Sequence, residues 1–309
     1  MHPVFLLAIY CAVVAVASLV GGWVPLVMRL THRRMQIAIS FVSGVMLGIG
    51  LLHLLPHSYE SLGAIDPTVT WVLAGFLFMF FLERFFAFHH HDAPDEGSVL
   101  DGGTASRESS VHTHVHAVGE PPRHGHAHGT TSGSVFPWGG AAIGLTLHGL
   151  VDGVAIAAAI KAESATDPTA WAGLGAGLAI ALHKPFDSLT IGTLMAASGR
   201  SARSRHVLNA LYALVTPLGA VLFYALGSGP LEQGLGQALG FAAGAFICIA
   251  TSDLLPELQF HRHDRAVLSA ALLAGIALAW STVFLEGEGH GHSHAPASAP
   301  SGAHDHDHE

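Results

Sequence analysis

Eight apolar stretches of about 20 residues each constrain the fold of this chain more than any other feature of its sequence. A helix needs about 20 apolar residues to cross the hydrocarbon core of a bilayer, so each stretch predicts one transmembrane helix. Polar breaks, among them 56–67 and 161–168, separate the stretches. We therefore expect an all-α polytopic membrane protein. The eight stretches lie near 4–28, 36–56, 68–88, 135–160, 169–196, 207–227, 235–256 and 266–285.

The composition agrees with a membrane protein and excludes several other classes. Only 11% of the residues are charged and 50% are hydrophobic, whereas a soluble domain carries about 25% charged residues. There is no basic stripe of the kind that binds nucleic acid, so we expect no nucleic-acid partner. Cys11 and Cys248 lie within apolar stretches, so we interpret both as small buried hydrophobic residues.

The distribution of basic residues predicts the orientation in the membrane. The first stretch is too long for the core of a signal peptide and is followed by its positive charges, so we expect it to stay as the first helix. With the N-terminus outside, eleven of the 13 basic residues fall on the inner side, as the positive-inside rule requires. We therefore expect both termini outside.

Two polar segments hold most of the histidines. The third connection and the C-terminal tail contain fifteen of the 24 His residues, many of them in His-x-His spacing. We expect the connection to be disordered. Flexible imidazoles are suited to exchangeable capture of transition metals, although a solvated His-rich spacer is an alternative. The predicted organisation is helices in 1–88, a cytoplasmic His-rich loop in 89–134, helices in 135–286 and an extracytoplasmic tail in 287–309.

Two His-x-x-x-Asp pairs lie within predicted helices. They are His148 with Asp152 on the fourth helix and His183 with Asp187 on the fifth. Residues four apart share one face of a helix, so each pair can present an imidazole and a carboxylate to one ion. Ionisable residues within a membrane are candidate sites by default, and four N and O ligands suit Zn²⁺ or a similar divalent metal. The alternative is a structural role in which His–Asp hydrogen bonds lock two helices together.

Neighbouring residues add further expectations. We interpret Lys184 as filling a place where a second cation could otherwise sit; a structural ion pair is the alternative. Pro185 removes a helical hydrogen bond, which frees the carbonyl of Ala181 and could widen a cavity or simply kink the helix.

Polar residues near the ends of two other helices are secondary candidates. His53 and His57 fall near the outer face, and Asp253 and Glu257 near the inner face, which suits entrance and exit stations. Capping and hydration of helix ends explain them equally well. Met46 can serve as a soft ligand or as plain core packing.

The chain resembles the ZIP (Zrt/Irt-like protein) family of divalent metal transporters over nearly its whole length. The stretch His148 to Gly153 is similar to the family's His-Asn-x-Pro-Glu-Gly, and His183 to Ser188 is similar to its His-Glu-x-x-Glu type of motif. Ser43 to Pro56 is similar to the family's second helix and Ala242 to Glu257 to its seventh. The sequence departs from the pattern at Asp152 and Asp187, where Glu is usual, and at Gly149, Val151 and Lys184.

The resemblance implies a metal site and a mode of movement. The site would be formed by His148, Asp152, His183 and Asp187, with Met46 nearby. A second site would need Asp253 and position 184, so Lys184 favours one firmly held metal. The family also implies an elevator-like shift of helices one, four, five and six against the others. His ligands bind metal only when deprotonated, so we expect transport to weaken as the pH falls through about 6–7.

The resemblance favours uptake of zinc into the cytoplasm by a carrier that is not an enzyme. Cd²⁺, Fe²⁺, Mn²⁺, Co²⁺ and Ni²⁺ are alternative cargoes, because they accept the same ligands. A divalent metal efflux carrier and a zinc-dependent intramembrane hydrolase are the rival functions; the latter lacks a His-Glu-x-x-His motif and an evident general base. The expected location is a bacterial inner (plasma) membrane, and a homodimer is compatible with the sequence.

Overall fold

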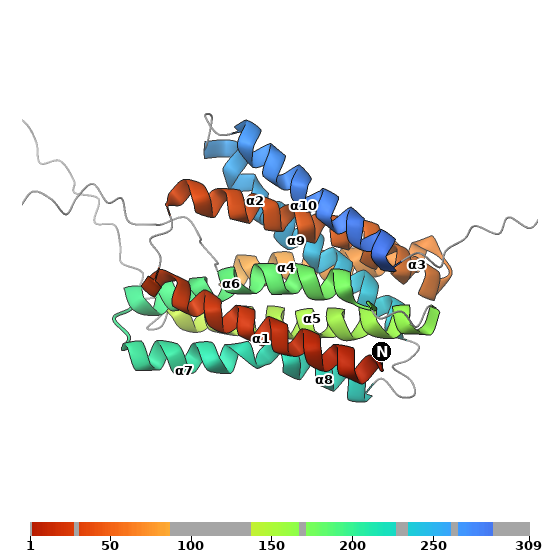
Figure 1. Cartoon of the computed structure of the whole chain (residues 1–309), viewed down its shortest axis with the longest axis horizontal. Coiled ribbons are helices and arrows are strands. Elements are labelled where there is room, and N and C mark those ends of the chain that lie inside the picture. Colours follow the sequence, from red (N-terminus) through yellow and green to blue (C-terminus); the bar gives the residue numbers. More distant parts are fainter. Residues whose placement is uncertain are drawn as a thin grey trace, which may run out of the picture.

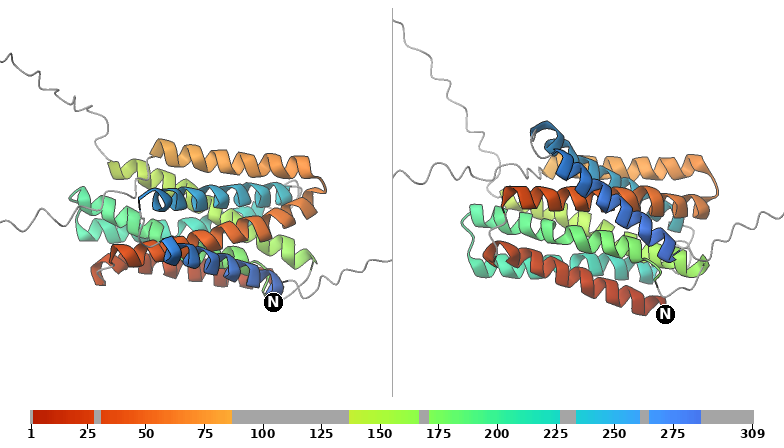
Figure 2. Two further views of the ribbon diagram at one scale, coloured as in Figure 1. Left: turned by 90° about the horizontal axis from the view of Figure 1, so that it is seen from above. Right: turned by 45° about the horizontal axis from the view of Figure 1, so that its top comes forward.

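The computed structural model describes residues 2–27, 31–86, 137–166, 171–226, 234–260 and 265–286, with some side chains left out, including all of those at 253–260. Both predicted His-rich segments, 89–134 and 287–309, lie outside these residues. The described part is a bundle of helices that run roughly along one axis (Figure 1; Figure 2). The helices are α1 (Pro3–Val27), α2 (His32–Ile49), the π-helix η1 (Gly50–Leu54), α3 (Leu55–Leu62), α4 (Ile65–Phe86), α5 (Pro137–Thr166), α6 (Leu174–Ala197), α7 (Ala202–Ala213), α8 (Val215–Leu226), α9 (Leu235–Phe260) and α10 (Arg265–Glu286).

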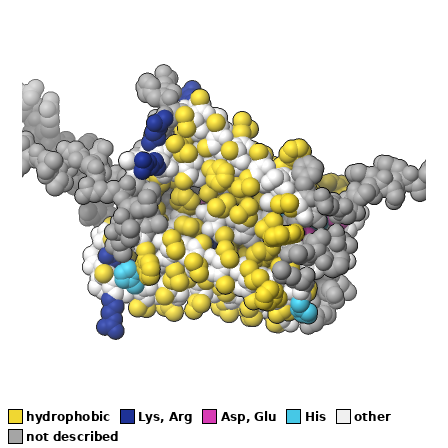
Figure 3. Space-filling view, viewed as in Figure 1, with side chains coloured by type: hydrophobic (Ala, Val, Ile, Leu, Met, Phe, Trp, Pro, Cys, Tyr) yellow, Lys and Arg dark blue, Asp and Glu magenta, His cyan; other side chains and the backbone are white. Residues whose placement is uncertain are grey.

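These elements confirm the predicted class of an all-α polytopic membrane protein. Seven segments of the described chain are long and apolar enough to cross a membrane. Helix α6 completes the eight predicted spans. It has 24 residues and contains Lys184 and Asp187. Apolar side chains cover the middle of the face shown in Figure 3, where a lipid-exposed surface would lie.

The predicted break at 56–67 is wrong in its extent. The helical segment formed by α2, η1 and α3 continues through Pro56 to Leu62. It ends at Gly63, which has a positive φ of 70°. Just before Pro56 the chain widens into the π-helix η1, and the N–H of Leu55 reaches the carbonyl of Gly50. Proline lacks an N–H and its ring crowds the preceding turn, so a wider turn lets the helix continue past it.

Two other boundaries also differ from the prediction. The fourth predicted stretch was expected to end before a polar break at 161–168, but α5 continues to Thr166. The sixth stretch is divided at Leu214 into α7 and α8. Pro217 supplies no N–H for the carbonyl of Ala213, which accounts for the interruption.

The helices pack in two groups. The α5 group contains α1, α5, α6, α7 and α8, and the α9 group contains α2, η1, α3, α4, α9 and α10. The most extensive packing lies inside the groups, α5 against α8 and α1 against α6 in the first, α2 against α10 and α4 against α9 in the second. In Figure 1 the α5 group occupies the lower half, below α2, α9 and α10.

Small residues permit this close packing. A Cβ added at Gly153 would collide with the backbone of Thr216 and Ala220, so α5 and α8 touch backbone to backbone at that point. Gly153 adjoins Asp152. The contact therefore fixes the position of His148 and Asp152 along the bundle and the direction in which α5 presents them.

Candidate metal centre

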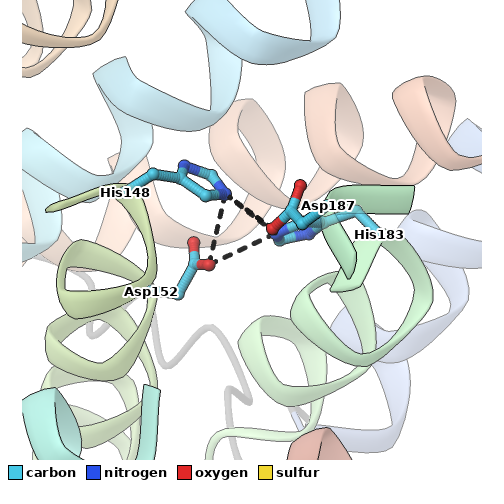
Figure 4. Close-up of side chains that lie close together, drawn as sticks. All are labelled: His148, Asp152, His183 and Asp187. Carbon is cyan, nitrogen blue, oxygen red and sulfur yellow. Dashed lines mark hydrogen bonds and ion pairs between the residues drawn. The ribbon is translucent and has the colours of Figure 1, made fainter. Parts of the chain in front are cut away.

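The structure brings the two His-x-x-x-Asp pairs together. His148 and Asp152 lie one turn apart on α5, and His183 and Asp187 lie one turn apart on α6. Figure 4 shows the four side chains pointing toward one another between the two helices. Each offers one ligand atom, and these four atoms all lie within 4.8 Å of one another. This proximity is what the spacing on adjacent helices predicted; metal binding itself stays a prediction.

The distances between the ligand atoms match the edges of a small tetrahedron. Nε2 of His148 lies 3.3 Å from Oδ2 of Asp152 and 3.3 Å from Oδ2 of Asp187. Nε2 of His183 lies 3.3 Å from Oδ2 of Asp152 and 3.9 Å from Oδ2 of Asp187. The two Nε2 atoms are 3.3 Å apart. A tetrahedral Zn²⁺ with N and O ligands separates them by about 3.3–3.6 Å, so the side chains need only small adjustments.

One imidazole is already oriented for metal binding. Nδ1 of His183 lies 2.9 Å from the carbonyl oxygen of Ala179. A carbonyl can only accept, so Nδ1 carries the proton and donates it. In the neutral ring, Nε2 then keeps its lone pair and directs it at the other ligands.

Lys184 lies against the same two carboxylates. Its Nζ donates to Oδ2 of Asp152 at 2.6 Å and to Oδ2 of Asp187 at 3.2 Å. The side chain of Lys184 is fully buried. A buried pair of carboxylates needs a nearby positive charge, and the ammonium supplies it. Gly149 leaves room for this group, because a Cβ there would lie 3.3 Å from Nζ.

Tyr212 is a further partner that the sequence did not reveal. Tyr212 lies on α7, and its hydroxyl donates a hydrogen bond to Oδ2 of Asp187 at 2.8 Å. Nothing in the sequence around Tyr212 distinguishes it from other aromatic residues of an apolar helix. Hydrogen bonds of this kind hold ligating carboxylates in position.

The structure describes the side chains of two of the four other predicted site residues, Met46 and His53. Met46 is fully buried on α2 in the core of the bundle, and its role as a ligand stays a prediction. His53 belongs to a different cluster with His57 and Glu163. The side chains of Asp253 and Glu257 lie outside the described residues.

Glu163 is the second residue that the sequence analysis missed. Its carboxylate Oε1 lies 2.8 Å from Nε2 of His53, and both side chains are buried. The sequence analysis placed Glu163 in the predicted polar break at 161–168, and an acidic residue in a connecting loop does not indicate a site. Its position on α5, fifteen residues after His148, makes it an intrahelical acid.

The comparisons with known proteins agree with this architecture. The family model described as ZIP zinc transporter matches residues 5–281. Zinc transporter ZIP4 of Mus musculus is 26% identical over 293 residues, which cover 82% of this chain and 43% of that protein. Zinc transporter ZIP5 of Homo sapiens is 27% identical over 252 residues, with 70% and 45% covered. Zinc transporter ZIP1 of Bos taurus is 26% identical over 276 residues, with 82% and 80% covered.

The chain spans less than half the length of the ZIP4 and ZIP5 relatives and most of the length of ZIP1. The match to the family model begins in α1, ends in α10 and includes both His-x-x-x-Asp pairs. On that match, the chain belongs to the ZIP zinc transporter family.

Proposed function

We propose that this protein carries zinc or a similar divalent transition metal across a membrane into the cytoplasm. The cargo would bind His148, Asp152, His183 and Asp187. The observation that supports this function best is the spacing of the four ligand atoms, because five of their six separations are 3.3–3.9 Å. Two imidazoles and two carboxylates at such distances suit tetrahedral Zn²⁺. Cd²⁺, Fe²⁺, Mn²⁺, Co²⁺ and Ni²⁺ are competitors, because selectivity depends on geometry.

The distribution of charge supports the orientation. On the face shown in Figure 3, Lys and Arg side chains gather at the end of the bundle opposite the N-terminus. Basic residues favour the cytoplasmic side, so this end faces the cytoplasm and the N-terminus faces outward. A bacterial inner (plasma) membrane is the setting we infer for this orientation.

The packing supports alternating access by an elevator-like movement. All four proposed ligands lie on α5 and α6, inside the α5 group. The α9 group contributes contacts such as the ring of Phe246, whose centroid is 6.4 Å from that of His183. A shift of the α5 group against the α9 group would therefore carry the intact site with it.

Lys184 supports a single bound metal. The ammonium and two carboxylates give the site a net charge of about −1, and one bound dication would change this to about +1. A second dication would add repulsion in a buried region where little solvent screens it. The cargo is consequently one ion at a time.

Flux through purified protein tests the proposal. Proteoliposomes that contain the full chain should accumulate ⁶⁵Zn²⁺, and Asp152→Ala or His183→Ala should abolish accumulation. Asp66→Ala is the matched control, since it removes an exposed carboxylate from the first turn of α4. A fully active Asp152→Ala protein would exclude the His/Asp site as the transport site.

The direction needs a separate measurement because an efflux carrier would use the same ligands. The measurement uses proteoliposomes sorted by the orientation of the protein, with ⁶⁵Zn²⁺ added on either side. Zinc should move from the outer face of the protein to its cytoplasmic face. A carrier that only exports from that face would contradict the proposed direction but leave the site intact.

A further inference from the structure

A second group of metal-ligating side chains lies at the end of the bundle that carries the N-terminus. It consists of His53 on η1, His57 on α3 and Glu163 on α5, and its ligand atoms lie within 4.8 Å of one another. Nε2 of His53 is 2.8 Å from Oε1 of Glu163. The rings of His53 and His57 are 4.9 Å apart between centroids. Figure 1 shows α3 at the same end as the N-terminus.

This cluster is distinct from the His/Asp centre. Glu163 follows Asp152 by eleven residues on α5, which corresponds to about 16 Å along the helix axis. No ligand of one cluster can therefore reach an ion held in the other.

The surrounding contacts hold the three side chains in place. Oε2 of Glu163 accepts a hydrogen bond from the backbone N–H of Gly173 at 2.6 Å, which leaves Oε1 directed at His53. A Cβ at Gly175 would lie 3.4 Å from Cδ2 of His53, so the glycine leaves space for the imidazole. Nδ1 of His57 donates to Oε2 of Glu60 at 3.2 Å, which leaves Nε2 of the neutral ring with the lone pair that a metal could use.

We infer that His53, His57 and Glu163 form a second binding site for a divalent transition metal such as Zn²⁺. Two imidazoles and one carboxylate are a frequent zinc ligand set, and three protein ligands leave the fourth position open to water. An open position favours exchange, in contrast to the four protein ligands of the His/Asp centre. A bound ion would replace the hydrogen bond between His53 and Glu163, and the proton of that bond would be released.

The position of the site suggests its role. His53 and His57 belong to the α9 group and Glu163 belongs to the α5 group, so a bound ion bridges the two groups at one end of the bundle. If the protein transports metal as proposed above, this is where an ion is captured before it reaches the deeper centre. This role rests on the proposed function, whereas binding of the ion does not.

Anomalous diffraction from the full chain soaked with Cd²⁺ tests binding directly. We expect one peak among His53, His57 and Glu163 and a separate peak at the His/Asp centre. A peak at the centre alone would overturn the inference. Localisation by diffraction also separates these ions from any held by the His-rich segments.

Two substitutions and one control make the test specific. Glu163→Gln should remove the first peak and preserve the second. His57→Gln should do the same and leaves the buried Glu163–Gly173 contact intact, so it decides the matter if Glu163→Gln fails to fold. Asp66→Asn, which removes an equal charge from the exposed first turn of α4, should keep both peaks.

Transport measurements then separate this inference from the proposed function. Both ligand variants should raise KM for ⁶⁵Zn²⁺ uptake severalfold and leave kcat nearly unchanged. If neither the wild type nor any variant transports zinc, the proposed function fails, while the peak among His53, His57 and Glu163 still supports the inferred site. Variants that lose the peak among His53, His57 and Glu163 but keep KM unchanged would show that this site plays no part in capture.

Discussion

The ammonium of Lys184 lies 2.6 Å from Oδ2 of Asp152, closer than either imidazole nitrogen, each of which is 3.3 Å from the same oxygen. A metal ion that binds Asp152 must therefore compete with a cation that belongs to the protein. The ammonium offsets part of the carboxylate charge and would limit how tightly the centre could hold a metal ion.

Replacing Lys184 should change the stability of the protein differently in the absence and in the presence of metal. Lys184→Met removes the buried cation and should destabilise the metal-free protein by about 3–5 kcal/mol, because two carboxylates lose their partner. Saturating Zn²⁺ should restore most of the loss. Thermal unfolding in a chelator and in excess Zn²⁺ measures both effects.

Lys161→Met provides a matched control. Lys161 lies 4.9 Å from the ring centroid of Tyr224, away from the centre, and its loss should cost about 0.5–1 kcal/mol with little dependence on Zn²⁺. A metal-free Lys184→Met protein as stable as the wild type would contradict the assigned role of Lys184.

The hydroxyl of Tyr212 should affect metal binding without touching the metal. Tyr212→Phe leaves the ring in place and removes the hydrogen bond to Asp187, so we expect KM for zinc uptake to rise by about tenfold. Tyr59→Phe removes a hydroxyl from an exposed residue of α3 and should leave KM unchanged. Equal kinetics of the two variants would count against a positioning role.

Two glycines on the α5 and α6 helices should respond in opposite ways to the same change. Gly153→Ala forces α5 away from the backbone of α8, so we expect a loss of about 1–3 kcal/mol and strongly reduced flux. Gly192→Ala adds a methyl group that meets no atom within 4 Å. It should be neutral or stabilising by up to about 1 kcal/mol.

Thermal unfolding of both alanine variants in one detergent measures the difference. A Gly153→Ala protein with unchanged stability and flux would show that the α5–α8 contact does not position Asp152.

The proposed orientation can be tested by labelling. In a chain with Cys11 and Cys248 replaced by Ala, Ala64→Cys lies in the turn between α3 and α4, and Ala202→Cys lies at the start of α7. An impermeant maleimide should label position 64 in intact cells and position 202 only after permeabilisation. The reverse pattern would invert the membrane orientation and with it the expected positions of the entrance and exit.

The sequence determined the class of fold and the two His-x-x-x-Asp pairs because both follow from local rules. An apolar stretch of about 20 residues has few alternatives to a membrane helix, and four-residue spacing places His148 with Asp152 and His183 with Asp187 on common faces. The sequence did not determine where each helix ends, because the helix that was expected to stop at Pro56 continues past it. A local π-turn compensated for the proline there.

Only the tertiary structure decided which residues meet between helices. Tyr212 reaches Asp187 from 25 residues away, and Glu163 reaches His53 from 110 residues away. These contacts depend on how closely and at what rotation the helices pack, as at the backbone contact beside Gly153. Helical periodicity assigns a residue to a face, whereas packing selects the partner that this face meets.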